Sequence, residues 1–226
     1  MVKEIDKNIL ASYLDLANHH PDARPEDIKK LCLKVQEFSF NSAFVNGCYV
    51  GLARERLGDK GKVGTVVSFP LGQDSQDAKV LAVIKAIKDG ADELDVSMNV
   101  GWFKAGKTDQ VLAEMSAVVE AAKSIKRLAV VKFIIETGFL TNEEIKQASK
   151  LVLKSGADFV KTCSGMGPRG AKLIDVELIR QAIGDKVRVK VAGGVHNLKE
   201  ALGFIEKGAD RIGTSKAVEI VNEMVD

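Results

Sequence analysis

Cysteine and histidine are both scarce in this chain of 226 residues. The cysteines are Cys32, Cys48 and Cys163, and the histidines are His19, His20 and His196. The cysteines form no C-x-x-C pair, and their odd number argues against a disulfide framework. Neighbouring residues on a strand point to opposite faces, so the adjacent His19 and His20 argue against a three-histidine zinc site. We therefore predict neither disulfides nor a metal held by histidines.

Long apolar runs and an excess of one charge are also absent. No long uncharged apolar run occurs, and the start, Met1-Val2-Lys3-Glu4, lacks a signal-peptide pattern. The formal net charge is +2 with both signs interspersed, which favours neither nucleic acid nor a membrane as partner. Apolar residues make up 46% of the chain, enough for a sizeable core. We expect a soluble globular protein of the cytoplasm.

Short β-prone apolar runs alternate with segments of helical period along the chain. The expected strands are Tyr13–Ala17, Ser42–Asn46, Val63–Phe69, Glu93–Met98, Leu128–Ile135, Phe159–Ser164, Arg188–Val191 and Arg211–Ser215. Helices are expected between them, including one from Pro25 and one of about four turns from Thr108. The pattern predicts eight strand–helix units with no linker.

A three-residue repeat supports this count. Gly90-Ala91-Asp92, Gly156-Ala157-Asp158 and Gly208-Ala209-Asp210 each follow an expected helix and lead into an expected strand. Such a joint is typical of a helix closed by a left-handed glycine before a parallel strand. The repeat favours an α/β fold, a closed (β/α)₈ TIM barrel that forms a single domain over residues 1–226. A doubly wound open sheet is the alternative.

Polar residues gather where the expected strands end, which is where a (β/α)₈ barrel carries its active site. Lys161 and Lys190 stand out because their strands would be neighbours, under about 5 Å apart. Two ammonium groups there would repel each other, so one would tend to give up its proton and become an amine nucleophile able to form a Schiff base. The alternative is that both lysines point outward or pair with acids such as Asp158. Their positions among valines and just before glycines favour the catalytic interpretation.

Asp95 is flanked by Leu94 and Val96 near the middle of its expected strand. A carboxylate inside the barrel could pair with the lysines and carry protons. A structural ion pair is the alternative, and spacing alone does not separate the two. Whether Lys132 faces the barrel interior is also left open.

Glycine-rich turns follow the last three expected strands. Gly193-Gly194 and Gly213-Thr214-Ser215 lie where many barrels bind phosphate through backbone N–H groups, although an ordinary tight turn is the alternative. The segment 165–170 matches the dinucleotide pattern G-x-G-x-x-G. We do not favour a dinucleotide, because Lys161 interrupts the strand and the strand of Lys190 does not end in the acid that would hold a ribose.

Several separate blocks resemble the deoxyribose-phosphate aldolases, class I aldolases of the (β/α)₈ type. The most specific blocks are Ala157-Asp158-Phe159-Val160-Lys161-Thr162 with Ser164-Gly165, and Val189-Lys190-Val191-Ala192-Gly193-Gly194-Val195. Others are Arg211-Ile212-Gly213-Thr214-Ser215, Phe133-Ile134-Ile135-Glu136-Thr137-Gly138, Asp92-Glu93-Leu94-Asp95 and Phe69-Pro70-Leu71-Gly72. The resemblance covers nearly the whole chain.

This resemblance implies specific roles. Lys161 would be the Schiff-base lysine, Lys190 the neighbouring cation that favours its neutral form, and Asp95 the proton relay. Ser164 would touch a sugar hydroxyl, and Asp15 would support the polar network of the substrate site. The implied phosphate-binding residues are Gly165, Gly193, Gly194, Gly213 and Ser215.

The implied reaction is reversible cleavage of 2-deoxy-D-ribose 5-phosphate into glyceraldehyde 3-phosphate and acetaldehyde. The resemblance implies a small phosphorylated sugar as substrate, no cofactor, and a homo-oligomer, with a dimer favoured. A class I aldolase for another phosphorylated sugar or keto acid, or a non-catalytic phosphate-binding barrel, is the alternative.

Four positions depart from the family pattern. After the first strand the family often reads Asp-His-Thr-Leu-Leu or Asp-Leu-Thr, whereas this chain has Asp15-Leu16-Ala17-Asn18 and lacks the threonine hydroxyl. Phe44 stands where a cysteine usually precedes Val-Asn-Pro, Cys163 where serine is more common, and Lys216 where a second serine is frequent. None of these changes removes an expected catalytic group.

Overall fold

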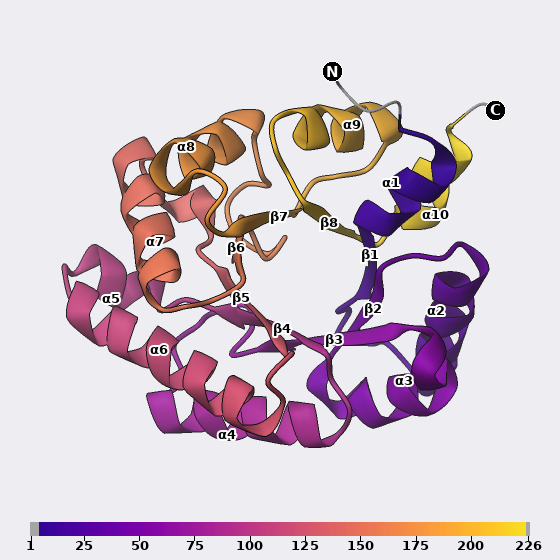
Figure 1. The fold of residues 1–226 in the computed structure, drawn as a ribbon, viewed down its shortest axis with the longest axis horizontal. Helices are drawn as coiled ribbons and strands as arrows, with labels where there is room; N and C mark the ends of the chain where they lie inside the picture. The colour runs from indigo at the N-terminus through magenta and orange to yellow at the C-terminus, as the bar shows by residue number, and fades with distance from the viewer. Residues whose placement is uncertain (1–4, 225–226) are drawn as a thin grey trace.

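The computed structural model describes residues 5–224 and contains a closed barrel of eight parallel strands surrounded by helices (Figure 1). The strands are β1 (Leu14–Asn18), β2 (Ser42–Val45), β3 (Lys62–Val67), β4 (Glu93–Ser97), β5 (Val130–Ile134), β6 (Phe159–Lys161), β7 (Arg188–Ala192) and β8 (Arg211–Thr214). Each strand pairs with the next along the chain, and β8 pairs with β1 to close the sheet. The predicted (β/α)₈ barrel is confirmed, and the open-sheet alternative is wrong.

Helices form the outer layer of the barrel (Figure 1). They are α1 (Lys7–Tyr13), α2 (Pro25–Glu37), α3 (Val50–Leu57), α4 (Gln76–Lys88), α5 (Val100–Lys104), α6 (Thr108–Ile125), α7 (Asn142–Lys154), α8 (Leu173–Ile183), α9 (Leu198–Glu206) and α10 (Ala217–Asn222). Short 3₁₀ helices lie at η1 (Gly47–Tyr49), η2 (Gly58–Lys60) and η3 (Thr137–Phe139). Among residues 5–224, no helix combines the length and apolarity that crossing a membrane requires. The start of the chain, Met1-Val2-Lys3-Glu4, lies outside the described residues.

Besides shifts of one or two residues at several strand ends, local elements differ from the expectation in the following ways. Helix α1 precedes the first strand and is capped by the Asp6 side chain, which accepts a hydrogen bond from the N–H of Ile9. Helix α5 is a further unexpected element, begun by an Asn99 side-chain cap. Helix α6 has 18 residues, about five turns and not four. Strand β6 ends at Lys161 and not at Ser164, so the residues after the lysine form a loop.

The three Gly-Ala-Asp joints fasten neighbouring strands to each other. In each joint the aspartate carboxylate accepts a hydrogen bond from a backbone N–H of the preceding strand. These pairs are Asp92 with Val63 at 2.9 Å, Asp158 with Val131 at 2.8 Å, and Asp210 with Val189 at 2.7 Å. A basic side chain from the helix before that preceding strand donates to the same carboxylate (Arg54 of α3, Lys123 of α6 or Arg180 of α8). The glycines of all three joints have positive φ, as the sequence predicts.

Strand alternation separates an apolar outer layer from a charged interior. In β5, Val131 and Phe133 belong to the apolar cluster packed beneath the helices, whereas Lys132 between them reaches inside to Glu93 and Asp95. The question left open for Lys132 is therefore answered: it faces the barrel interior. The same alternation directs Lys161 and Lys190 inward.

Candidate active site

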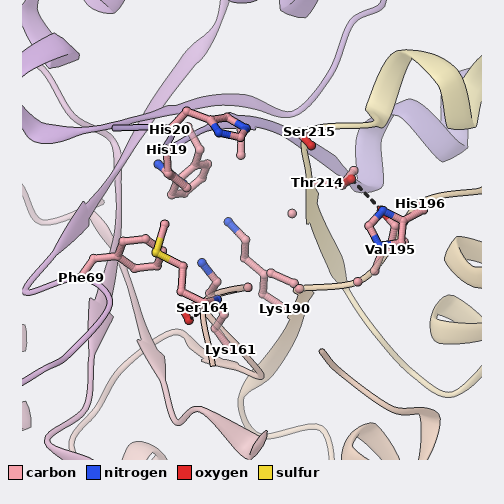
Figure 2. A pocket seen from close by; sticks show the side chains of 18 of the residues that line it. His19, His20, Phe69, Lys161, Ser164, Lys190, Val195, His196, Thr214 and Ser215 are labelled. Atoms are coloured by element: carbon pink, nitrogen blue, oxygen red, sulfur yellow. Dashed lines mark hydrogen bonds between the residues drawn. The ribbon is translucent and has the colours of Figure 1, made fainter. Parts of the chain in front are cut away.

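A cavity of about 240 Å³ opens at the carboxyl ends of the strands. Its walls come from the ends of β1, β6, β7 and β8 and the loops that follow them, together with Phe44 of β2 and Phe69. Figure 2 shows the side chains of Lys161 and Lys190 rising side by side into this space. Both lysines are otherwise enclosed, with 3% and 1% of their surface exposed. The carboxyl end of the barrel is thus where the cavity and the lysines meet.

Lys161 and Lys190 share one carboxylate oxygen. The two residues lie directly opposite each other on β6 and β7. Asp95 Oδ2 lies 2.8 Å from Lys161 Nζ and 2.9 Å from Lys190 Nζ. Asp95 itself is fully buried beneath the cavity. The structure therefore brings together the three residues that the sequence predicts to be catalytic.

Asp95 and Lys190 are also members of a closed ring of alternating charges inside the barrel. The ring runs from Asp95 through Lys190, Asp15, Arg211, Glu93 and Lys132 and back to Asp95, with N···O distances of 2.9, 2.7, 3.0, 3.6, 2.6 and 3.0 Å. Lys161 joins this ring as a seventh charge through Asp95. If all seven groups were ionised, four cations would face three anions. The ring is internally balanced, and Lys161 is the surplus cation.

Burial and neighbouring charges shift several pKa values in this cluster. Burial raises the pKa of the Asp95 carboxyl, but Lys132, Lys161 and Lys190 outweigh burial and hold that pKa well below its usual range. Asp15 behaves alike, because Lys190 and Arg211 outweigh its burial and lower its pKa. Burial lowers the pKa of Lys190, and the Asp15 and Asp95 carboxylates oppose the fall. Both aspartates therefore stay ionised at neutral pH.

Lys190 has more partners than Lys161. Besides its two carboxylates, the Lys190 ammonium lies 3.4 Å from the centre of the Phe44 ring, whose face attracts a cation. Phe44 has room inside the barrel because Gly64 stands opposite it on β3, where a Cβ would lie 2.3 Å from the ring. Lys161 has Asp95 alone as its ion-pair partner among the described residues and lies 5.8 Å from the centre of the Phe69 ring. Lys190 therefore has two carboxylates and an aromatic face around its ammonium, whereas Lys161 has one carboxylate.

The expected phosphate-binding residues lie together on one wall of the cavity. Gly165, Gly193, Gly194, Gly213 and Ser215 all line it. Gly213 also lets Lys190 pass, since a Cβ there would lie 2.9 Å from Lys190 Cε. Lys216 pairs with Glu219 at 3.0 Å and does not line the cavity. The structure thus groups the expected residues of three successive loops on one wall, and Lys216 lies outside it.

The two side chains expected to bind substrate, those of Ser164 and Asp15, lie at different depths in the barrel. Ser164 lines the cavity, and its Oγ accepts a hydrogen bond from the N–H of Met166. Asp15 lies below the cavity in the charged ring, where Ser42 and Asn41 also donate to it. Asp15 therefore reaches the cavity only through Lys190.

Several residues of the site were not expected from the sequence. Glu93, Lys132 and Arg211 complete the ring, and Glu136 accepts a hydrogen bond from the N–H of Ser164 at 3.0 Å. Glu93 could have been found, because it lies two residues before Asp95 and so faces the same side of the strand. Arg211 could not have been found in this way, because an arginine at the start of a strand is equally compatible with a position on the surface.

Cys163, which departs from the family pattern, and the three histidines also lie at or near the site. Cys163 is buried beside Thr137, and burial raises the pKa of its thiol to about 11, so it is no nucleophile at neutral pH. All three histidines line the cavity. Within residues 5–224, no group of three or more His, Cys, Asp and Glu side chains is arranged to hold a metal ion.

A (β/α)₈ barrel with charged lysines and acids buried beneath a cavity at the carboxyl ends of its strands has the architecture of a barrel enzyme. The model of the DeoC/LacD family aldolases matches residues 4–215 of the chain. A deoxyribose-phosphate aldolase of Aciduliprofundum boonei is 44% identical over 221 residues, covering 97% of this chain and 99% of that protein. One of Caldanaerobacter subterraneus subsp. tengcongensis is 43% identical over 215 residues, covering 95% and 93%.

A solved structure agrees with these relatives. The tetrameric deoxyribose phosphate aldolase of Aeropyrum pernix superposes with a TM-score of 0.88 at 30% identity, covering 96% of this chain and 92% of that one. The chain belongs to the DeoC/LacD family of aldolases, which are lyases. The resemblance noted in the sequence is confirmed.

Proposed function

We propose that the protein cleaves 2-deoxy-D-ribose 5-phosphate reversibly to D-glyceraldehyde 3-phosphate and acetaldehyde, through a Schiff base on Lys161. The observation that carries this proposal is the surplus cation at Lys161, which shares Asp95 with Lys190 at the floor of the cavity. The relatives named deoxyribose-phosphate aldolase support the choice of substrate.

The charge balance of the cluster supports Lys161 as the nucleophile. Loss of one proton takes four cations and three anions to neutrality, and a buried cluster favours the neutral total. Lys190 contacts Asp15, Asp95 and the Phe44 ring, whereas Lys161 pairs with Asp95 alone, so we assign the loss of the proton to Lys161. A neutral lysine amine in a desolvated site attacks carbonyl carbons.

The reaction then follows from the electron demand of the Schiff base. The Lys161 amine adds to the C1 aldehyde, and loss of water gives a protonated imine. The C2–C3 bond breaks as its electron pair moves toward the imine nitrogen, while the C3 hydroxyl loses its proton and becomes the aldehyde of glyceraldehyde 3-phosphate. The enamine left on Lys161 takes a proton at C2, and water releases acetaldehyde. We assign the relay of protons between Lys190, water and the reacting atoms to Asp95, whose carboxylate contacts both ammonium groups.

The cavity wall formed by the loops after β6, β7 and β8 supports the proposal of a phosphorylated substrate. Gly165, Gly193, Gly194, Gly213 and Ser215 line the cavity together, and we assign their backbone N–H groups and the Ser215 hydroxyl to binding the phosphate. An anion bound there would fix the C5 end of the sugar and leave C1 to reach Lys161. Ser164 also lines the cavity, and we assign to it a contact with a sugar hydroxyl.

Assembly and location are further parts of the proposal. The tetrameric relative supports a homo-oligomer, and we favour a dimer in the cytoplasm. Size-exclusion chromatography with light scattering distinguishes a monomer, a dimer and a tetramer.

Borohydride trapping tests the mechanism. The protein is incubated with deoxyribose 5-phosphate and borohydride, and the reduced adduct is located by peptide mass. An adduct at Lys161 is expected; an adduct at another lysine, or none, contradicts the mechanism. Acetaldehyde release from deoxyribose 5-phosphate, measured beside cleavage of fructose 1,6-bisphosphate, distinguishes this substrate from those of other sugar aldolases.

A further inference from the structure

Glu136 is a buried acid beside the active site that the mechanism above does not use. It lies two residues after β5, is 4% exposed, and does not line the cavity. Its backbone is held on both sides. The Ile135 N–H donates to the Lys161 carbonyl at 3.0 Å, and the Thr137 N–H donates to the Thr162 carbonyl, also at 3.0 Å. The position of Glu136 is therefore fixed relative to the strand that carries the proposed nucleophile.

The backbone of Glu136 is in the left-handed region, with φ of 53° and ψ of 67°. Residues that carry a Cβ adopt this region infrequently, whereas glycine does so without steric cost. Strain of this kind persists only where the surrounding structure holds it, and it clusters at functional sites. A glutamate at a position that suits glycine indicates that its side chain has a role.

The Glu136 carboxylate lies against the segment 164–167 of the loop after β6. One oxygen, Oε2, accepts a hydrogen bond from the N–H of Ser164 at 3.0 Å. The other oxygen, Oε1, lies beside Gly167, where a Cβ would be only 2.7 Å away. Oε1 is buried and has no hydrogen-bond partner among the described residues. Both ends of the segment therefore contact one carboxylate, which touches the loop and not the cavity.

The segment 164–167 carries two residues assigned above to the substrate. Ser164 and Gly165 both line the cavity, Ser164 for a sugar hydroxyl and Gly165 for the phosphate (Figure 2). Gly165 also packs closely on Gly193, since a Cβ on Gly193 would lie 3.2 Å from the Gly165 nitrogen. A shift of the segment would therefore reach a second residue of the proposed phosphate site.

We propose that Glu136 is a positioning residue: by accepting the Ser164 N–H, its carboxylate fixes the segment 164–167 so that Ser164 and Gly165 meet the sugar phosphate. A hydrogen bond from a backbone N–H to a carboxylate is charge-assisted and stronger than a neutral one. A loop held in its binding conformation does not have to be ordered when the substrate arrives, so Glu136 contributes to affinity and not to the chemistry at Lys161. This inference rests on the proposed aldolase function.

The test separates an effect on the loop from an effect on Lys161. In Glu136→Met we expect the KM for deoxyribose 5-phosphate to rise by about tenfold, as for loss of about one hydrogen bond to the substrate, with kcat within about threefold of wild type. Exchange of the methyl protons of acetaldehyde with D₂O needs only the Schiff base and the enamine on Lys161. This exchange, followed by NMR, should stay within about twofold of wild type.

Three further variants complete the test. Glu136→Gln keeps an acceptor for the Ser164 N–H and should have a KM between those of wild type and Glu136→Met. Glu114→Met removes another buried glutamate, one that pairs with Lys79 away from the cavity. It should lower the thermal unfolding midpoint and leave KM unchanged. If Glu136→Met does not fold, Glu136→Gly, which suits the left-handed backbone, replaces it with the same expected rise in KM.

Each other result has a distinct meaning. A parallel fall of kcat and acetaldehyde exchange in Glu136→Met would show that Glu136 acts on Lys161 and would overturn the inference. An unchanged KM, or a KM in Glu136→Gln as high as in Glu136→Met, would overturn it too. An equal rise of KM in Glu114→Met would do the same, because KM would then follow stability. If the wild-type protein neither exchanges acetaldehyde nor cleaves the sugar phosphate, the proposed function itself fails, and the inference falls with it.

Discussion

Two buried lysine clusters in this barrel protein behave in opposite ways. Lys79 of α4 is enclosed between α4 and α6, where its ammonium contacts Glu114 Oε1 at 2.6 Å, the Gly72 carbonyl at 2.7 Å and the Ser97 carbonyl at 3.1 Å. Its three donors meet three acceptors, and one cation faces one anion. Lys161 has one carboxylate, shared with Lys190, and a cavity above it. The two lysines are equally buried, and what distinguishes Lys161, the proposed nucleophile, is the unequal charge around it and its open side.

The two clusters also differ in what they hold in place. Lys79 ties the loop after β3 to the end of β4, because its two carbonyl partners belong to those segments. Burial lowers the pKa of Lys79 and raises that of Glu114, while their ion pair opposes both shifts. This cluster is structural, and its charges have no route to a substrate.

The largest expected effect is on catalysis at Lys161. Lys161→Ala removes the nucleophile, so cleavage of deoxyribose 5-phosphate should fall on the order of 10⁴-fold or more. The borohydride adduct should vanish, while the thermal unfolding midpoint stays close to that of wild type. Activity within tenfold of wild type would contradict the assigned role.

The structural cluster should show the reverse pattern. Lys79→Met leaves Glu114 as an unpaired buried acid, and breaking such a pair costs about 3–5 kcal/mol of unfolding free energy. Urea unfolding measures this loss, and kcat of the folded fraction should change far less than in Lys161→Ala. The double variant Lys79→Met, Glu114→Leu removes both charges and should recover part of the stability. A double variant less stable than the single one would show that the pair is not the source of the loss.

Lys190→Leu tests the charge balance directly. Without Lys190, three cations face three anions, so loss of a proton from Lys161 would no longer bring the buried cluster to neutrality. We expect kcat to fall by about 10²-fold or more and the pH–rate profile to move toward alkaline pH. A reduced rate with an unmoved profile would mean that Lys190 has another role.

The smallest expected effect is a change of stability in acid. The folded-state pKa values of Asp15 and Asp95 are lowered, so their contribution to stability is complete above the unfolded-state pKa of about 3.9. It should be lost progressively as pH falls below that value. Asp95→Asn, although less stable at neutral pH, should lose less stability between pH 5 and pH 3 than wild type. Urea unfolding at a series of pH values checks this, and parallel curves for the two proteins would contradict it.

Much of the site followed from repetition and alternation in the chain. Eight apolar runs and three Gly-Ala-Asp joints indicated the barrel, and the neighbouring positions of Lys161 and Lys190 followed from strand order. The added helices α1 and α5 were not expected, because each is a short segment begun by a local side-chain cap and has a weak pattern of its own. The catalytic and phosphate-binding roles of the predicted residues stay predictions until the variants are measured.

The sequence by itself determined the positions of the strands along the chain, and it favoured a barrel order, an inward direction for the two lysines and a common wall for the glycine turns. Local patterns suffice for these features, because side-chain alternation and turn preferences act over a few residues. Only the tertiary structure decided that Glu93, Lys132 and Arg211 close a ring with Asp15, that Lys79 is inert, and that Glu136 accepts the Ser164 N–H. The reason is that the protonation of a buried group depends on the sum of charges around it, and that sum is assembled from strands far apart in the chain.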